Sequence, residues 1–230
     1  MHSHNYPGFY RGIVADTVDP LNAGRIRMMV PQLFGEALTE WAWPVTGSIS
    51  QMKYPYGTFS SNETQFVSAA NAATVVTFNN VEDTNETEIV GGTKIKVKAT
   101  GDYFFQFSAQ FSRSSASTAQ ADIWLRKNGV DIPRTNSRVT LQGNPNEVLV
   151  TLNYIVDLKA EDYLEVVFSS SDATVKILSV SSLTGPDRPD IPSIIATVNL
   201  VGRFIPNTGS GVWAAFEGGD PNFPIWIGTF

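Results

Sequence analysis

Few residues of this chain have the types and spacing that catalysis needs. Among its 230 residues the only histidines are His2 and His4, and there is no cysteine. One chain therefore cannot assemble a histidine-based triad, a zinc site of histidines or thiolates, or a cysteine nucleophile, and it has no disulfide. Both histidines stand in a polar start that is typical of an exposed tail, so we expect neither to act in a site.

The acidic pair Glu217 and Asp220 is the best candidate for acid–base chemistry. Two carboxyl groups roughly 5 to 10 Å apart could act as the acid and base of a glycosidase. The same residues belong to a run, Glu217-Gly218-Gly219-Asp220-Pro221, in which two glycines permit positive φ and the proline fixes the following backbone. We interpret Gly218, Gly219, Asp220 and Pro221 as a structural turn and predict no catalytic residue.

Two other patterns are weaker. The acidic run Glu82-Asp83 with Glu86 and Glu88 offers oxygen ligands for calcium, but it lacks the spacing of a known calcium loop, and a solvated loop explains it better. Gly91-Gly92 is not followed by the Lys-Ser/Thr of a phosphate-binding loop and is interpreted as a turn. The sequence thus predicts no metal and no cofactor.

Composition and charge narrow the class of protein further. With 16 basic and 22 acidic residues the formal net charge is −6, which repels a phosphate backbone, so we expect no nucleic-acid partner. No stretch approaches the roughly 18 to 20 apolar residues of a membrane helix, and the start lacks the apolar core of a signal peptide. We expect a soluble protein without membrane insertion or Sec export.

Short apolar and β-branched runs separated by Gly, Pro, Asn and Asp predict an all-β fold. The runs at the two chain ends are 12–15, 25–30, 41–45, 211–216 and 224–229. Neither end has enough strands for a barrel, but together they give the five of an OB-like barrel. Four of the five tryptophans belong to these end segments, and we assign Trp41, Trp43, Trp213 and Trp226 to the strands and core of the barrel.

The middle of the chain has a different texture, rich in Ser, Thr, Asn and Ala. Its strand-like runs, 93–98, 102–107, 121–126, 148–152 and 163–168, are sufficient for a β-sandwich. Tyr103, Phe105 and Trp124 are assigned to its core. Three prolines between 186 and 192 oppose strand pairing, so we interpret 185–193 as a stiff linker and 48–53 as its counterpart. The predicted domains are 1–47 with 194–230, forming the split barrel, and 54–184, forming the insert.

The end segments resemble the OB-like domain of hub and spike proteins from contractile phage tails. The residues that carry the resemblance are Phe9-Tyr10-Arg11-Gly12-Ile13-Val14, Asp19-Pro20 to Gly24-Arg25-Ile26-Arg27, Trp41-Ala42-Trp43-Pro44, and Gly211-Val212-Trp213 through the Glu-Gly-Gly-Asp-Pro turn to Pro224-Ile225-Trp226-Ile227-Gly228. The chain departs from the hub pattern because it has no lysozyme domain and no repetitive β-helix needle, so another protein would supply the spike tip.

The middle segment is similar to the jelly-roll of the complement C1q and tumour-necrosis-factor type. Thr100-Gly101-Asp102-Tyr103-Phe104-Phe105, Trp124-Leu125-Arg126-Lys127-Asn128-Gly129 and Leu158-Lys159-Ala160-Glu161-Asp162-Tyr163-Leu164-Glu165 match the family's Gly-x-Tyr-Phe strand, Asn-Gly turn and Gly-Asp-x-Leu strand. Glu161 stands where that family has Gly. Both families commonly form trimers, so the resemblance implies a homotrimer.

These resemblances imply a structural virion protein of a phage tail or baseplate, assembled in the host cytoplasm, with other tail proteins as partners and no enzymatic activity. Its mechanism would be surface burial. The alternative is a receptor- or carbohydrate-binding module that recognises a host-surface glycan through the jelly-roll. A hydrolase of cell-wall sugars is a third reading, and it lacks a credible acid–base pair.

Overall fold

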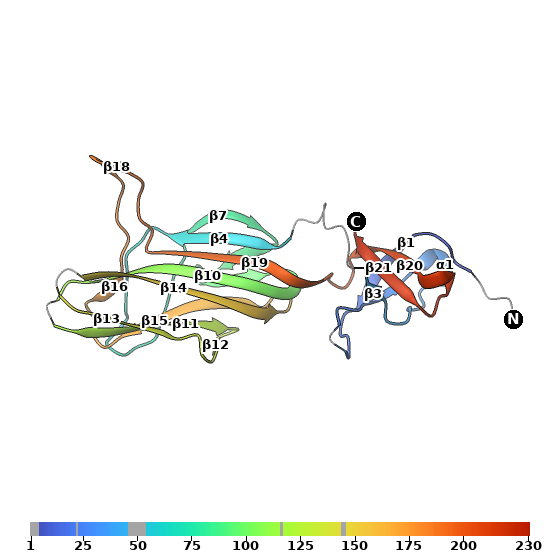
Figure 1. Ribbon diagram of the computed structural model, residues 1–230, viewed down its shortest axis with the longest axis horizontal. Helices are drawn as coiled ribbons and strands as arrows, with labels where there is room; N and C mark the ends of the chain where they lie inside the picture. The colour runs from blue at the N-terminus through green and yellow to red at the C-terminus, as the bar shows by residue number, and fades with distance from the viewer. Residues whose placement is uncertain (1–4, 22, 46–53, 116, 144–145) are drawn as a thin grey trace. The chain divides into compact units, whose positions relative to one another are not determined.

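The computed structural model describes residues 5–21, 23–45, 54–115, 117–143 and 146–230, and nearly all of their regular structure is β-strand (Figure 1). The chain divides into two compact units. The first contains Met1–Lys53, Ala99–Gly101 and Gly202–Phe230, and the second contains Tyr54–Lys98 and Asp102–Val201. The predictions of an all-β fold, and of one unit built from both ends of the chain, are confirmed.

The first unit is built on one sheet. Its strands are β1 (Tyr10–Asp16), β2 (Arg27–Met29), β3 (Trp43–Pro44), β20 (Gly211–Phe216) and β21 (Pro224–Thr229). They lie in the order β2-β1-β20-β21-β3, and every neighbouring pair is antiparallel except β21 with β3.

Two bridges close this sheet into a barrel. Ile26 pairs with Ala42 and Met29 pairs with Leu38, which joins β2 to the segment that leads into β3. The ring therefore has five strands with the two ends of the chain interleaved, as in an OB barrel. The short helix α1 (Pro31–Phe34) lies between β2 and β3 in the sequence, and the 3₁₀ turn η1 (Glu217–Gly219) joins β20 to β21.

Alternation along the barrel strands decides which tryptophan is inside. Trp226 is 5% exposed and belongs to the barrel core. The other core residues are Val14, Ile26, Met28, Val30, Ala42, Ile205, Val212, Ala214 and Phe216. Trp213 lies between the buried Val212 and Ala214, so it faces outward and is 37% exposed. Trp43 follows the buried Ala42 and is 53% exposed, and Trp41 is half-buried. Trp43 and Trp213 do lie in strands, as predicted, but the assignment of Trp41, Trp43 and Trp213 to the core is wrong.

The second unit is a β-sandwich of two sheets, which Figure 1 shows as two layers. Sheet 1 contains β5 (Gln65–Phe66), β16 (Val175–Ile177), β10 (Thr100–Arg113), β19 (Ile194–Ile205), β4 (Tyr56–Ser61) and β7 (Asn80–Asn85) in that order, with β14 (Asn146–Leu158) also paired to β10. Sheet 2 contains β12 (Val130–Asp131), β11 (Ala119–Lys127), β15 (Tyr163–Ser170), β9 (Lys94–Val97) and β8 (Thr87–Val90) in that order, with β13 (Ser137–Leu141) paired to β11 and β6 (Thr74–Val75) paired to β15.

Strands from distant parts of the chain alternate between the two sheets, which is the arrangement of a jelly-roll. Tyr103 and Phe105 point into the layer between the sheets and are fully buried. Trp124 does not. It alternates with the buried Ile123 and Leu125, and so it lies on the outer face of sheet 2 beside Asp122 and Arg126. Its assignment to the insert core was wrong for that reason.

The end of the insert also differs from the prediction. Residues 194–199 of β19 pair with β4, with Ile194 opposite Ser61 and Asn199 opposite Tyr56. The second unit therefore continues to Val201 instead of ending at 184. The proline-rich stretch predicted as a linker is a hairpin, in which β17 (Leu183–Thr184) pairs with β18 (Asp187–Arg188). The other predicted linker, 48–53, lies outside the described residues.

Candidate interaction surfaces

The turn after β20 is held by its own backbone and by Asp220. Gly218 has φ of 59° and Gly219 has φ of 78°, a region that favours glycine. A Cβ on Gly219 would also overlap the Asn5 side chain, and the Gly219 carbonyl accepts a hydrogen bond of 2.9 Å from the backbone N–H of Tyr6. The Asp220 carboxylate accepts bonds of 2.9 and 2.8 Å from the backbone and side-chain N–H groups of Asn222. Asp220 therefore stabilises the turn.

A buried ion pair fixes the loop between β1 and β2. Asp19 accepts bonds of 2.6 and 3.0 Å from the Arg25 guanidinium, and of 3.0 and 2.7 Å from the backbone N–H groups of Leu21 and Ala23. Burial alone would raise the pKa of Asp19, but these bonds hold it well below its usual range. This pair was not among the sites predicted from the sequence. Its signal is an acid and an arginine six residues apart around a Pro and Gly loop.

Cations lie over the outward-facing aromatic rings of the barrel. The Arg25 guanidinium is 5.5 Å from the Trp41 ring and 5.2 Å from the Trp43 ring. On another part of the barrel, Arg11 lies 5.7 Å from the ring of Trp213. Trp and Arg are both enriched among the residues that contribute most to protein–protein binding.

The outer face of sheet 2 is covered by ion pairs. They join Lys96 to Glu88 and Glu161, Lys98 to Glu88, Arg126 to Asp131, Lys127 to Asp162, and Arg138 to Asp122, at N–O distances of 2.6 to 3.3 Å. The Trp124 indole N–H donates to Asp131 at 2.7 Å, and the Arg126 guanidinium lies 5.9 Å from the Trp124 ring. This face pairs its charges within the chain and is typical of a surface in contact with water.

The outer face of sheet 1 is different. By strand alternation, the side chains that face outward on the middle of β4, β19, β10 and β14 are half-buried or exposed and none is charged. They are Thr58, Ile195, Thr197, Asn199, Val201, Phe104, Gln106, Ser108, Leu149, Thr151, Asn153 and Ile155. We call these twelve residues the uncharged face. Several are large exposed hydrophobics, including Leu149 at 58% and Ile155 at 64% exposure. Carboxylates border it on more than one side. Glu147 and Asp157 on β14 stand toward its ends, and Glu82 and Asp83 on the edge strand β7 lie beside β4.

The sequence could have indicated the uncharged face, because its strands alternate core residues with Ser, Thr, Asn, Gln and aliphatic side chains. Two facts were needed that the sequence does not give. One is that β19 belongs to the insert, and the other is that β4, β19, β10 and β14 are neighbours in one sheet. The face is formed by segments up to about 140 residues apart in the chain.

One charged side chain is buried where the two sheets meet at the end of the sandwich. Arg113, the last residue of β10, is 1% exposed and its guanidinium donates to Asp172, which follows β15. Backbone N–H donation from Thr174 and the Arg113 guanidinium lower the pKa of Asp172 to about 2. The pair therefore ties the end of β10 to the connection between β15 and β16.

The acidic run that could have offered calcium ligands is spread over two strands. Glu82 accepts from the Ser60 hydroxyl at 2.5 Å, Asp83 accepts from the Tyr56 hydroxyl at 3.3 Å, and Glu88 pairs with lysines. Glu82, Asp83 and Glu88 therefore lie in strands, and only Glu86 lies in the turn between them, so the prediction of a loop is wrong for most of the run. Within the described ranges no three His, Cys, Asp or Glu side chains converge as metal ligands, and no helix could cross a membrane. His2 and His4 lie outside those ranges.

Comparison with known proteins does not identify a family for this chain. No protein-family model matches the chain, and a search of curated proteins finds no match. Among solved structures, the globular domain of zebrafish complement 1qA protein is similar at 16% identity, over 66% of this chain and 99% of that one, with a TM-score of 0.41. The description of the second unit as a jelly-roll rests on the strand pairing of the chain itself.

Proposed function

We propose that this chain is a structural protein of a phage tail or baseplate that acts by assembling into a homotrimer and docking on other tail proteins. The uncharged face of sheet 1 is the observation that carries the assembly role. The phage assignment is supported by the order of the barrel segments, which resembles that of the OB-like domain of tail hub proteins. The barrel that those segments form is interrupted by the jelly-roll between β3 and β20.

Charge favours a second copy of the same chain as the occupant of the uncharged face. Each copy has a formal net charge of −6, so most encounters between copies oppose like charges. The uncharged face lets two copies meet without that repulsion, and its exposed aliphatic side chains gain by burial. The trimeric state is supported by the resemblance of both units to families that form trimers.

The barrel supplies the docking part of this proposal. Trp43 and Trp213 are exposed on its outer surface and are held in place by Arg25 and Arg11. Exposed tryptophans that are already ordered lose little conformational entropy when a partner covers them. We assign them to contacts with neighbouring tail proteins.

Recognition of a host glycan has weaker support. A sugar-binding tryptophan needs a free ring face, whereas Trp124 carries Arg126 over its ring and its indole N–H is used by Asp131. An enzymatic role is also weakly supported, because Asp220 is held by Asn222 within its turn.

Multi-angle light scattering of the full chain over a dilution series tests the assembly. We expect a species of about 75 kDa, three times the 25.1 kDa of one chain. Side-chain-resolution imaging of the intact particle then tests the location, and the chain should occupy a symmetric ring of the tail. A chain that is monomeric both in solution and in the particle contradicts the proposal.

The variant Glu217→Gln tests the absence of catalysis. We expect its melting temperature and its assembly to match those of the unchanged protein, because Glu217 is exposed on the turn. Loss of a lytic activity on peptidoglycan in a variant that still folds and assembles would show that the chain is an enzyme.

A further inference from the structure

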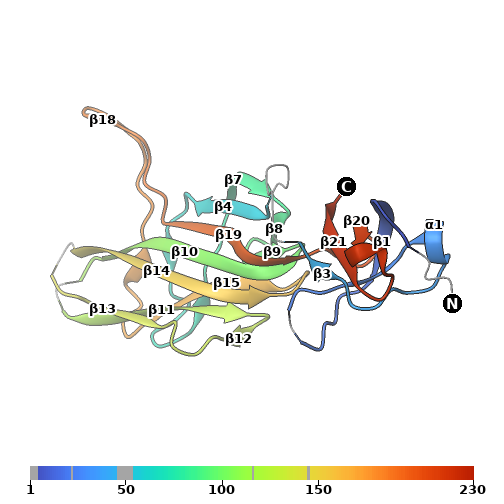
Figure 2. The same ribbon diagram turned by 45° about the vertical axis from the view of Figure 1, so that its right-hand side comes forward.

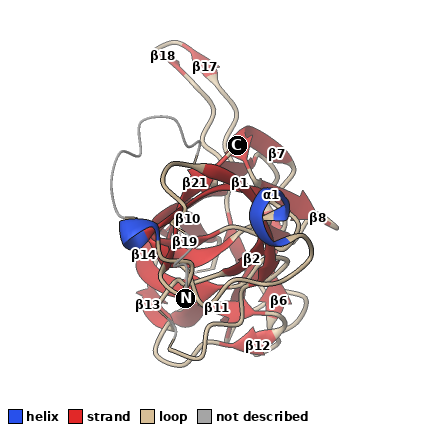
Figure 3. Ribbon diagram, turned by 90° about the vertical axis from the view of Figure 1, so that its right-hand side faces the viewer, coloured by secondary structure: helices blue, strands red, loops and turns tan. Residues whose placement is uncertain are grey.

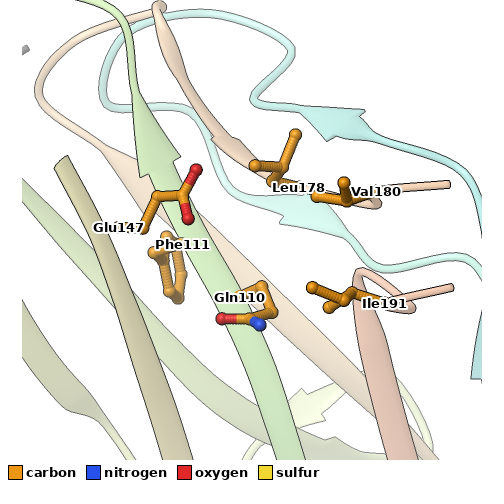
Figure 4. Close-up of a pocket in the computed structure, with 6 residues that line it drawn as sticks. All are labelled: Gln110, Phe111, Glu147, Leu178, Val180 and Ile191. Atoms are coloured by element: carbon orange, nitrogen blue, oxygen red, sulfur yellow. The ribbon is translucent and has the colours of Figure 1, made fainter. Parts of the chain in front are cut away.

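The pocket beside the base of the β17–β18 hairpin is too small for a ligand. Figure 4 shows Glu147 on one side of it and three aliphatic side chains, Leu178, Val180 and Ile191, on the other. Its volume of about 20 Å³ admits one water molecule. A partner is better accommodated on the outside of the barrel.

Four side chains form one exposed patch there. Arg11 lies opposite Trp213, and Ile13 lies opposite Gly211, where β1 pairs with β20. The Phe230 ring covers Gly211, because a Cβ added to that glycine would come within 2.7 Å of the ring. These residues belong to, or directly follow, β1, β20 and β21, which are neighbours in the barrel sheet (Figures 2 and 3). We call Arg11, Ile13, Trp213 and Phe230 the arginine patch.

The arginine patch is ordered as well as exposed. The ring centroids of Trp213 and Phe230 are 5.2 Å apart, and the Arg11 guanidinium lies 5.7 Å from the first ring and 5.2 Å from the second. The backbone N–H of Phe230 donates to the Gly211 carbonyl at 3.2 Å. Ile13 is 39% exposed and Phe230 is 58% exposed. Side chains that are already ordered lose little conformational entropy when a partner covers them.

Arg11 differs from the other arginine that lies over tryptophan rings of the barrel. Arg25, beside Trp41 and Trp43, forms an ion pair of 2.6 Å with Asp19. Arg11 takes part in no ion pair of the described residues. Its guanidinium is therefore exposed without a counter-charge. A guanidinium that lies over a ring has N–H groups at its edge, and these can donate to a carboxylate.

The nearest carboxylates along the strands of the arginine patch lie beyond it. Asp16 ends β1, past a bulge, and Glu217 follows the end of β20. Along an extended strand, Asp16 is about 16 Å from Arg11 and Glu217 is about 13 Å from Trp213. The patch itself contains three apolar side chains and one cation. Such a surface is complementary to a carboxylate that is surrounded by apolar residues.

We propose that the arginine patch docks a carboxylate-bearing apolar surface of a different protein, and that Arg11 pairs with a carboxylate of that protein. This inference deepens the docking role proposed for the barrel and rests on it. A second copy that offered the same patch would oppose Arg11 to Arg11, and the proposed function already assigns the second copy to the uncharged face. A carboxylate binds a guanidinium in a bidentate manner, and the apolar side chains around Arg11 exclude water from the pair.

Zero-length cross-linking in the intact particle tests the pair directly. In Arg11→Lys the new amine lies where a carbodiimide can join it, by an amide bond, to a carboxylate in contact. Arg138→Lys is the control for the chemistry, because Asp122 of the same chain lies 2.9 Å from Arg138 and should give an internal link. We expect a product that joins position 11 to an Asp or Glu of another protein, identified by mass spectrometry of the peptides.

Two results of the cross-linking overturn the proposal. One is a product that joins position 11 to a carboxylate of this chain, from the same copy or from another. The other is no product at position 11 in particles whose Arg138→Lys control gives its internal link.

Reconstitution measures how far docking depends on the charge of Arg11. Purified variants are added separately to particles assembled without the chain, and the concentration for half-maximal uptake is measured. Arg11→Met should raise it about tenfold, and Arg11→Glu should raise it further, because the new carboxylate repels that of the partner. Lys159→Glu makes the same charge change at an exposed site of the second unit and is the control. Equal uptake of Arg11→Glu and the control, or better uptake of Arg11→Glu than of Arg11→Met, overturns the proposal.

The same variants separate this inference from the proposed function. Their melting temperatures and the dissociation constant of the trimer should match those of the unchanged chain, because the uncharged face joins the copies. Loss of the trimer in Arg11→Glu would place the patch between copies, and Arg11-dependent binding of single-stranded DNA would make the anion a phosphate, so either result overturns the inference alone. Particles that never contain the chain remove the proposed function as well.

Discussion

The two outer faces of the sandwich use polar residues in opposite ways. On sheet 2 the charges are numerous and paired within the chain, for example Arg138 with Asp122. On the uncharged face of sheet 1 the polar residues are Thr, Ser, Asn and Gln, which neighbours of the same kind can satisfy without an ion pair. Both sheets pack against the same core, so the stability of the sandwich does not require one outer face to be charged and the other uncharged. It is explained if sheet 2 meets solvent and sheet 1 meets another copy.

The largest effect is expected when sheet 1 loses a central strand. Residues 54–201 contain all of the second unit and should unfold cooperatively on their own, whereas 54–184 lacks β19, which lies between β10 and β4. The shorter segment should show no cooperative thermal transition by circular dichroism. A cooperative melt of 54–184 comparable with that of 54–201 would mean that sheet 1 does not depend on β19.

A charge placed on each outer face compares the two faces directly. Thr197→Lys puts a cation on the uncharged face, where assembly would bury it without a partner, and should weaken the trimer about 100-fold or more. Thr140→Lys puts the same cation on the outer side of β13 in sheet 2 and should leave assembly unchanged. Light scattering on dilution measures both. If Thr140→Lys is the more disruptive variant, the two faces have been assigned the wrong way round.

The pair of buried Arg113 with Asp172 should contribute to stability in a pH-dependent way. Asp172→Asn leaves Arg113 buried without its counter-charge and should lower the free energy of unfolding by about 3 kcal/mol at pH 7. The folded pKa of Asp172, about 2, is below its ordinary value of 3.8. Its contribution is therefore fully present above about pH 4 and is lost as the pH falls toward 2.

Urea unfolding at pH 7 and at pH 2.5 measures this contribution. The difference between Asp172→Asn and the unchanged protein should shrink at the lower pH. A difference that stays constant would show that the pair is not the origin of the effect.

The smallest effect is expected for an ion pair on the outer face of sheet 2. Arg138→Met removes the partner of Asp122 at a site where the arginine is 58% exposed, and should change the midpoint of urea unfolding little, because water screens an exposed pair. Assembly should not change. A large fall in that midpoint would mean that the sheet 2 ion pairs are structural and would weaken their interpretation as a solvent surface.

The barrel could be predicted from the sequence because its signals are local. Turn chemistry around Pro20, Gly24, Gly218 and Gly219 marks where strands must end, and the runs between the turns became β1, β2, β20 and β21. Joining the two chain ends followed from the shortage of strands at either end.

The wrong predictions have two causes. One is the face of a strand on which a side chain lies, and the other is the pairing of strands that are far apart in the chain. A strand has two faces, and local sequence does not say which face is covered, so Trp124 and Trp213 were assigned inward although their neighbours fill the core. The three prolines predict a linker because they oppose a ladder, yet an isolated hairpin tolerates them, and β19 begins at Ile194, two residues after Pro192. The uncharged face needed the sheet order, which depends on contacts far apart in the chain.

The interleaving of the two chain ends in the barrel fixes the order in which the units can fold during synthesis. Strands β1 to β3 are complete at Pro44, but β20 begins only at Gly211, about 170 residues later, which is roughly 10 to 30 s of translation. The sandwich is complete at Val201 and can fold while the barrel still lacks two strands. A closed barrel therefore exists only on chains translated through β21, so ribosomes that stop early release copies that cannot dock.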